Sequence, residues 1–99
     1  MKLFKELKEQ GHQQVIFCGV DEVAEIAYLS LREVGMELAM VIDMVPDGDF
    51  FGHAVQPLDA VVDFGGTVVL TSLKRCGLLR KELLELGLSV DAIRGFGQG

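Results

Sequence analysis

Residues 15–24 read Val-Ile-Phe-Cys-Gly-Val-Asp-Glu-Val-Ala, and this stretch decides the fold. Its first part, 15–18, is a continuous apolar run that is rich in β-branched and aromatic side chains and stops at Gly19. Such a run is typical of a strand that is buried on both faces. From Asp21 the apolar spacing changes to that of an amphipathic helix, which ends at Gly35. The side chains expected on the inner face of this helix are Val23, Ile26, Ala27, Ser30, Leu31 and Val34.

Similar patterns continue along the chain. Residues 37–43 form a second apolar run that ends in Asp43, and residues 67–71 form a third. A helix capped by Thr71 or Ser72 is expected to run to Leu86, with Leu79, Leu83 and Leu86 facing inward. The remaining expectations are a helix at 2–10, a turn at 46–49, a loop leading into a short strand at 50–55, one or two helical turns at 57–62 and an edge strand at 92–96.

Buried strands that alternate with amphipathic helices pair in parallel, because right-handed crossovers place the helices on both faces of the sheet. The predicted fold class is α/β: a small Rossmann-like open parallel sheet of about four or five strands with helices on both faces. We expect a connecting helix at 1–12, a Rossmann-like domain at 13–96 and a loose tail at 97–99. The apolar stripe of the first helix, with Phe4 and Leu7, either packs on the domain edge or faces a partner subunit.

The charge balance and the cysteines narrow the classes of partner. Fifteen acidic and nine basic side chains give the 99 residues a formal net charge of −6, so direct binding to DNA or RNA is not expected. There is no signal-peptide pattern and no apolar run long enough to span a membrane. We therefore expect a cytoplasmic protein with no membrane partner. Cys18 and Cys76 form no Cys-x-x-Cys pair, which argues against a disulfide framework and a zinc site.

The turn after the first strand carries part of a dinucleotide-binding fingerprint. Gly19 and Val20 leave the strand, and Ala24 stands where a small residue allows close packing of helix and strand. Asp43 ends the second strand, where an acidic side chain can hold a ribose hydroxyl. These residues, together with Asp21, are the candidates for cofactor binding at this turn.

Asp21 stands where the fingerprint has the glycine that lets the backbone approach a pyrophosphate. Two like charges about 4 Å apart near a protein surface repel by about 4 kcal/mol, whereas a helix N-terminus attracts an anion by only about 0.3 to 1 kcal/mol. Repulsion therefore dominates unless Asp21 turns away or a cation bridges it. We interpret Asp21 as the N-cap of the helix. An NAD(P) or nucleotide-sugar cofactor is disfavoured for this reason.

A basic cluster begins at the third strand-to-helix junction, with Lys74, Arg75, Arg80 and Lys81. Ser72, Lys74 and Arg75 share the carboxyl edge of the predicted sheet, where a phosphate or an acidic partner could dock. The alternative is a solvated helix face. Ser72 and Lys74 complete the candidate cofactor-binding residues.

No catalytic or metal-binding constellation is recognisable. Tyr28, the only tyrosine, is followed four residues later by Arg32 rather than by the lysine of a short-chain dehydrogenase dyad, so we interpret it as a packing residue. Cys18 precedes a helix N-terminus, which can lower a thiol pKa, but position 24 lacks the arginine of a Cys-x5-Arg loop, and a buried structural cysteine is favoured. His12 and His53 are interpreted as loop or surface histidines.

The segments 17–31, 41–43, 51–55 and 69–72 resemble a Rossmann-like domain found in several bacterial families. The resemblance is stronger to the domain that follows a winged-helix DNA-binding domain in some bacterial transcriptional regulators, and looser to nucleotide-sugar dehydratases and epimerases. In such relatives the turn reads Gly-Ala-Gly-Glu-Val-Ala-Glu, which corresponds to residues 19–25 here, with Asp21 in place of a glycine.

Three functions remain in competition at the level of sequence. The leading hypothesis is a non-enzymatic Rossmann-like regulatory or interaction module with a degenerate nucleotide-binding turn, which works as a homo-oligomer or with a DNA-binding protein partner. The alternative is a nucleotide, dinucleotide or nucleotide-sugar sensor that uses Asp43 for the ribose and Ser72 with Lys74 for phosphate. The third is a dehydratase- or epimerase-like enzyme fragment that borrows catalytic groups from another chain.

Overall fold

The structure, a computed structural model, describes residues 2–95. The elements run in the order α1 (Lys2–Glu9), β1 (Gln14–Cys18), α2 (Glu22–Glu33), β2 (Glu37–Asp43), β3 (Asp49–Phe50), β4 (His53–Pro57), α3 (Ala60–Phe64), β5 (Val68–Leu70), α4 (Cys76–Glu85), the 3-10 helix η1 (Val90–Ala92) and β6 (Ile93–Gly95). The tail expected at 97–99 lies outside the described residues. Within them, no helix is long and apolar enough to cross a membrane.

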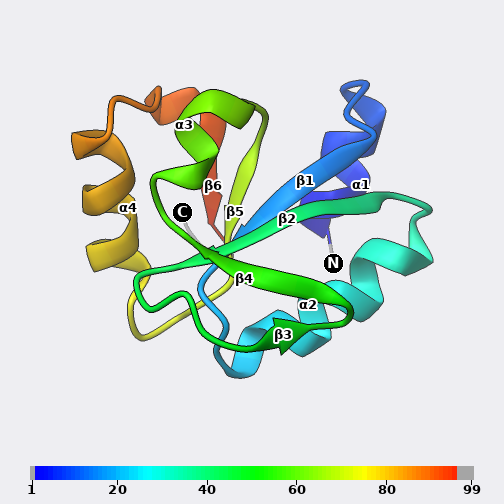
Figure 1. Cartoon of the computed structure of the whole chain (residues 1–99). Coiled ribbons are helices and arrows are strands. Elements are labelled where there is room, and N and C mark those ends of the chain that lie inside the picture. Colours follow the sequence, from blue (N-terminus) through cyan, green and yellow to red (C-terminus); the bar gives the residue numbers. More distant parts are fainter. Residues whose placement is uncertain (1, 96–99) are drawn as a thin grey trace.

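The six strands form one sheet in the order β3-β4-β2-β1-β5-β6 (Figure 1). Strand β1 lies at its centre and pairs in parallel with β2 on one side and β5 on the other. Strands β4 and β6 extend the sheet in parallel, and among the described residues only the two-residue strand β3 is antiparallel. The predicted Rossmann-like α/β fold is confirmed. Strand β3 is an addition to it, because Phe50, expected in a loop, pairs with His53 across a tight turn.

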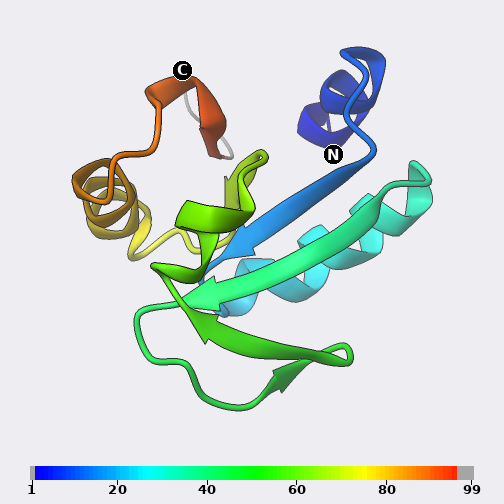
Figure 2. The same cartoon turned by 45° about the horizontal axis from the view of Figure 1, so that its top comes forward.

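Alternate side chains of β1 pack into two separate cores on opposite faces of the sheet. Val15 and Phe17 belong to the core that contains residues of α1 and α2, whereas Ile16 and Cys18 belong to the core that contains residues of α3 and α4. The buried strand predicted at 15–18 is therefore correct, and helices cover both faces (Figure 2). The carboxyl end of β1, where the chain turns into α2, lies between those of β2 and β5.

Helix α1 packs on the protein's own core. Phe4 and Leu7 are fully buried, and the ring of Phe4 stacks on that of Phe17 with centroids 6.0 Å apart. Of the two alternatives for this apolar stripe, the structure shows packing on the domain.

Two predicted helix faces are wrong in part. Ile26 was expected inside but is 59% exposed, because Ala24, Ala27 and Leu31 form the buried stripe of α2 and Ile26 lies outside it. Leu86 was also expected inside, but it is the C-cap of α4 and is 37% exposed. Helix α4 starts at Cys76 rather than directly after Thr71 or Ser72.

Candidate functional site

The turn after β1 passes close to the loop after β5, and Gly19 makes this approach possible. Gly19 has φ +103°, and a Cβ atom there would lie 2.9 Å from Leu79 Cδ1 and 3.0 Å from Ser72 Cβ. The backbone N–H of Gly19 donates to the carbonyl oxygen of Ile42 at 2.9 Å. The carboxyl ends of β1, β2 and β5 are thus brought together at one edge of the sheet.

Asp21 stands at the N-cap position of α2, but its side chain makes no capping hydrogen bond. The interpretation of Asp21 as a side-chain cap is therefore wrong. Its carboxylate instead accepts hydrogen bonds from the Ser72 hydroxyl and from the Arg75 guanidinium. The physical reason is that a bidentate, charge-assisted pair with a guanidinium is stronger than a hydrogen bond to a neutral backbone N–H.

Arg75 bridges the two acidic residues that follow β1 and end β2. On Asp21, Arg75 Nε lies 3.0 Å from Oδ2 and Nη2 lies 3.0 Å from Oδ1. On Asp43, Nη1 lies 2.8 Å from Oδ1 and Nη2 lies 3.0 Å from Oδ2. We call these three residues the Asp21–Arg75–Asp43 bridge. Its guanidinium is a cation that bridges Asp21 and offsets the negative charge there.

Hydrogen bonds occupy all the acceptor sites of the Asp43 carboxylate. Besides the two bonds from Arg75, its Oδ2 accepts the backbone N–H of Val20 at 2.9 Å and its Oδ1 accepts that of Met44 at 2.6 Å. A carboxylate offers about four acceptor sites, and these four bonds fill them. The Asp43 side chain is 9% exposed, so both its charge and its orientation are fixed by the protein.

The bridge keeps all three side chains charged. Hydrogen bonding from Arg75 holds the pKa of Asp21 below its usual range. Burial alone would raise the pKa of Asp43, but the hydrogen bonds from Arg75, Val20 and Met44 outweigh it and lower that pKa. The hydrogen bonds that Arg75 donates to Asp43 and Asp21 raise its own pKa. Two carboxylates and one guanidinium leave a net charge of −1 at the position where a nucleotide phosphate would approach.

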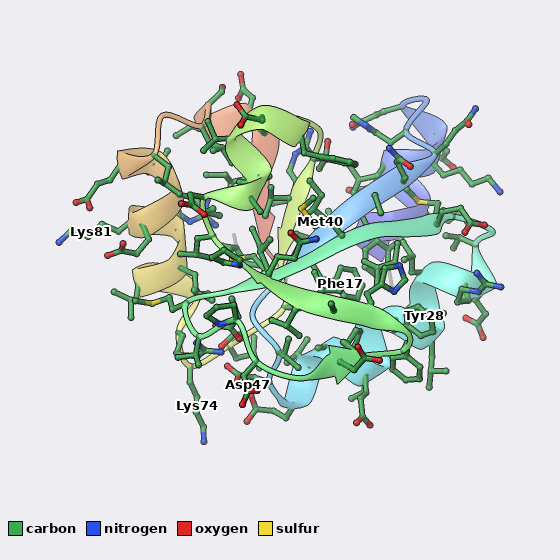
Figure 3. All side chains as sticks on the ribbon, viewed as in Figure 1. Phe17, Tyr28, Met40, Asp47, Lys74 and Lys81 are labelled. Carbon is green, nitrogen blue, oxygen red and sulfur yellow. The ribbon has the colours of Figure 1, made fainter. Side chains whose placement is uncertain are left out.

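The other predicted site residues divide between this bridge and the surface. Ser72 is 1% exposed and also fixes Arg75 through a 3.1 Å hydrogen bond from the Arg75 backbone N–H. Lys74 instead projects away from the molecule (Figure 3). Its side chain is 82% exposed, and its Nζ lies 3.9 Å from a carboxylate oxygen of Glu22. Ala24 is buried in the core beneath α2.

Arg75 lies outside the predicted cofactor-binding residues, although the sequence places it at the carboxyl edge with Ser72 and Lys74. The sequence signal for Arg75 is that one acidic residue follows β1 and another ends β2, at the same edge where Arg75 follows β5. A guanidinium, with its rigid fork of donors, suits two carboxylates better than a lysine ammonium does.

Other side chains that were weighed for chemistry have structural surroundings. Cys18 is fully buried, and burial, aided by Asp43, raises the pKa of its thiol to about 12. The ring of Tyr28 stacks on that of Phe51 with centroids 4.2 Å apart. His53 Nε2 lies 2.9 Å from the carbonyl oxygen of Leu38. Among residues 2–95 no group of three or more His, Cys, Asp or Glu side chains is placed to hold a metal ion.

Comparison with known proteins identifies a similar structure but no family. No protein-family model and no curated protein matches the chain significantly. The crystal structure of RSP, a Rex-family repressor, is similar with a TM-score of 0.57 and 17% sequence identity, over 95% of this chain and 57% of that chain. This chain therefore spans a little over half the length of that repressor chain. The similarity confirms the Rossmann-like fold, and it gives no support to the looser resemblance to dehydratases and epimerases.

Proposed function

We propose that the chain is a non-enzymatic regulatory or interaction module of Rossmann-like fold, in which Arg75 occupies the place of a nucleotide. The observation that carries this proposal is the Asp21–Arg75–Asp43 bridge. In open α/β sheets, ligands bind outside the carboxyl ends of the strands, where the chain connections diverge to opposite sides. The bridge spans that position, from the turn after β1 to the end of β2.

The ribose half of a nucleotide would need Asp43. A ribose hydroxyl could bind its carboxylate only by displacing one of the four donors that fill it, and two of these belong to the backbone of Val20 and Met44. A buried donor that loses its partner costs about 1 to 3 kcal/mol. This cost would reduce the free energy of ribose binding at Asp43.

The phosphate half would meet the carboxylate of Asp21. Arg75 offsets only one of the two negative charges at this edge, and its donors already point at them. The sensor alternative also relies on Ser72 and Lys74, yet the Ser72 hydroxyl donates to Asp21 and Lys74 extends into solvent. These contacts favour the degenerate turn over the sensor.

A regulatory role is supported by the similarity in fold to a repressor. The chain's net charge of −6 makes an accompanying protein, rather than this chain, the better candidate for DNA contact. A homo-oligomer or a DNA-binding partner, the connecting role of residues 1–12 and a cytoplasmic location stay predictions.

Calorimetric titration tests the proposal with NAD⁺, NADH and UDP-glucose as probes. Wild type is expected to bind each with a Kd weaker than about 1 mM, which corresponds to less than about 4 kcal/mol. Asp21→Gly removes the repelling carboxylate and releases Arg75 for a phosphate, so it is expected to gain at least tenfold in affinity. Asp47→Gly, in the loop after β2, is the matched control and should change nothing. Micromolar binding by the wild type would overturn the proposal and favour the sensor.

A further inference from the structure

We propose that an apolar hollow between α3, the end of α4 and η1 is the docking site for a basic amphipathic helix of a partner protein. The hollow has a volume of about 200 Å³. Its lining includes Val62, Leu86, Leu88 and Ala92, with the backbone of Gly65 and Gly87 between them. Three segments that are separate in sequence thus meet around one apolar depression.

Large apolar side chains are exposed in the segments that form this hollow. Val62 is 48% exposed, Leu86 is 37% exposed, and both line it directly. Phe64, at the end of α3, is 47% exposed, and Val90, in η1, is 62% exposed. Exposed apolar side chains at a hollow are one mark of an interaction site.

The size of the hollow indicates how a partner would use it. An apolar cavity of about 150 Å³ can take up benzene, so this hollow has room for one large apolar side chain. Gly65 and Gly87 are part of its lining and contribute no side chain to fill it. Helical partners place apolar anchors into such grooves at spacings of three and four residues.

Acidic side chains in the segments that form the hollow favour a basic partner. Asp63, Glu85 and Asp91 are exposed, and each is adjacent in sequence to a residue that lines it. The nearby Arg94 is partly buried, and its Nε donates to the carbonyl oxygen of Asp91 at 3.3 Å. A second copy of this chain would bring the same carboxylates together. Lysines or arginines around an apolar anchor complement them.

This inference deepens the proposed function, because it names the surface that an interaction module would offer. The proposed function and the docking site can be refuted independently of each other. The hollow lies near the amino ends of β5 and β6, whereas the Asp21–Arg75–Asp43 bridge lies at the carboxyl ends of β1 and β2. Nucleotide binding would overturn the proposed function alone, and failure of the experiment below would overturn the docking site alone.

The test uses a fluorescein-labelled 16-residue helical peptide with leucines on one face and lysines on the other. Anisotropy titration against the full chain is expected to give a Kd of about 10 to 100 μM, or about 5 to 7 kcal/mol. In ¹H–¹⁵N spectra the peptide should shift the amide signals of residues 62–66 and 86–92. The same peptide with glutamate in place of lysine should bind at least tenfold more weakly.

Matched variants assign the binding to this surface. Val62→Lys should weaken peptide binding at least tenfold, whereas Val45→Lys, at an apolar position in the loop after β2 that is 70% exposed, should leave it unchanged. Circular dichroism of both variants confirms that they fold. A Kd weaker than about 1 mM, equal binding of the glutamate peptide, or an equal effect of Val45→Lys would overturn the proposal. Self-association of the wild type that Val62→Lys abolishes would also overturn it, in favour of a second copy.

Discussion

Replacement of Arg75 by alanine should destabilise the fold more than any other single change of a surface charge. The side chain donates four hydrogen bonds of 2.8 to 3.0 Å to two carboxylates. Loss of one partner from a buried ion pair costs about 3 to 5 kcal/mol. The Arg75 side chain is 32% exposed and that of Asp21 is 25% exposed, so solvent screening reduces the expected loss to about 2 to 3 kcal/mol. Such a loss is a large part of the stability of a small domain, about 5 to 15 kcal/mol.

Urea unfolding followed by circular dichroism measures this loss. The midpoint of Arg75→Ala should fall by about 1 to 2 M at unchanged m value. Arg75→Lys keeps the charge but not the fork of donors, so its loss should be intermediate. Lys74→Ala is the control, because its 3.9 Å pair with Glu22 is exposed on both sides and should cost less than about 0.5 kcal/mol. If Arg75→Ala costs no more than Lys74→Ala, the bridge does not stabilise the fold.

Three further outcomes follow from the same contacts. Because both carboxylates of the bridge have lowered pKa values, their contribution is complete above the unfolded pKa of about 4 and is lost as the pH falls through the folded values. Urea unfolding between pH 7 and pH 3 should therefore show a smaller acid loss in Arg75→Ala than in the wild type, and equal losses would contradict this. The thiol of Cys18, with a pKa raised to about 12, should resist Ellman's reagent in the folded protein while the partly exposed Cys76 reacts; equal rates would refute its burial. Gly19→Ala should cost about 1 to 3 kcal/mol in urea unfolding, because its Cβ would approach Leu79 to 2.9 Å at a φ of +103°, and an unchanged midpoint would count against this close approach.

Most of the strands and their parallel pairing could be predicted, because apolar runs that alternate with amphipathic helices indicate buried parallel strands. The unbroken apolar run at 15–18 requires burial on both faces, and the structure divides it between two cores. The change of period after Asp21 likewise located α2. The inner face of that helix was predicted wrongly at Ile26, because the buried stripe runs through Ala24, Ala27 and Leu31 and leaves Ile26 in solvent.

Part of the arrangement at the predicted site could be expected from sequence, whereas cofactor binding there stays a prediction. Gly19, Asp21, Asp43 and Ser72 do meet at the carboxyl edge. The partner of Asp21 could not be read locally, because a cap is a contact within one helix whereas Arg75 is 54 residues away. Only the three-dimensional sheet brings that guanidinium between both carboxylates.

The most direct measurement of the central claim is the ¹H–¹⁵N signal of the Arg75 Nε–H group, recorded during a titration with NADH. Because this group donates to Asp21 at 3.0 Å, its signal should be sharp, slow to exchange with water and absent from the spectrum of Arg75→Ala. It should stay unchanged up to about 1 mM NADH, since the guanidinium is already held by both carboxylates. A signal that exchanges rapidly in the free protein, or that shifts at micromolar NADH, would show that Arg75 does not occupy the place of a nucleotide.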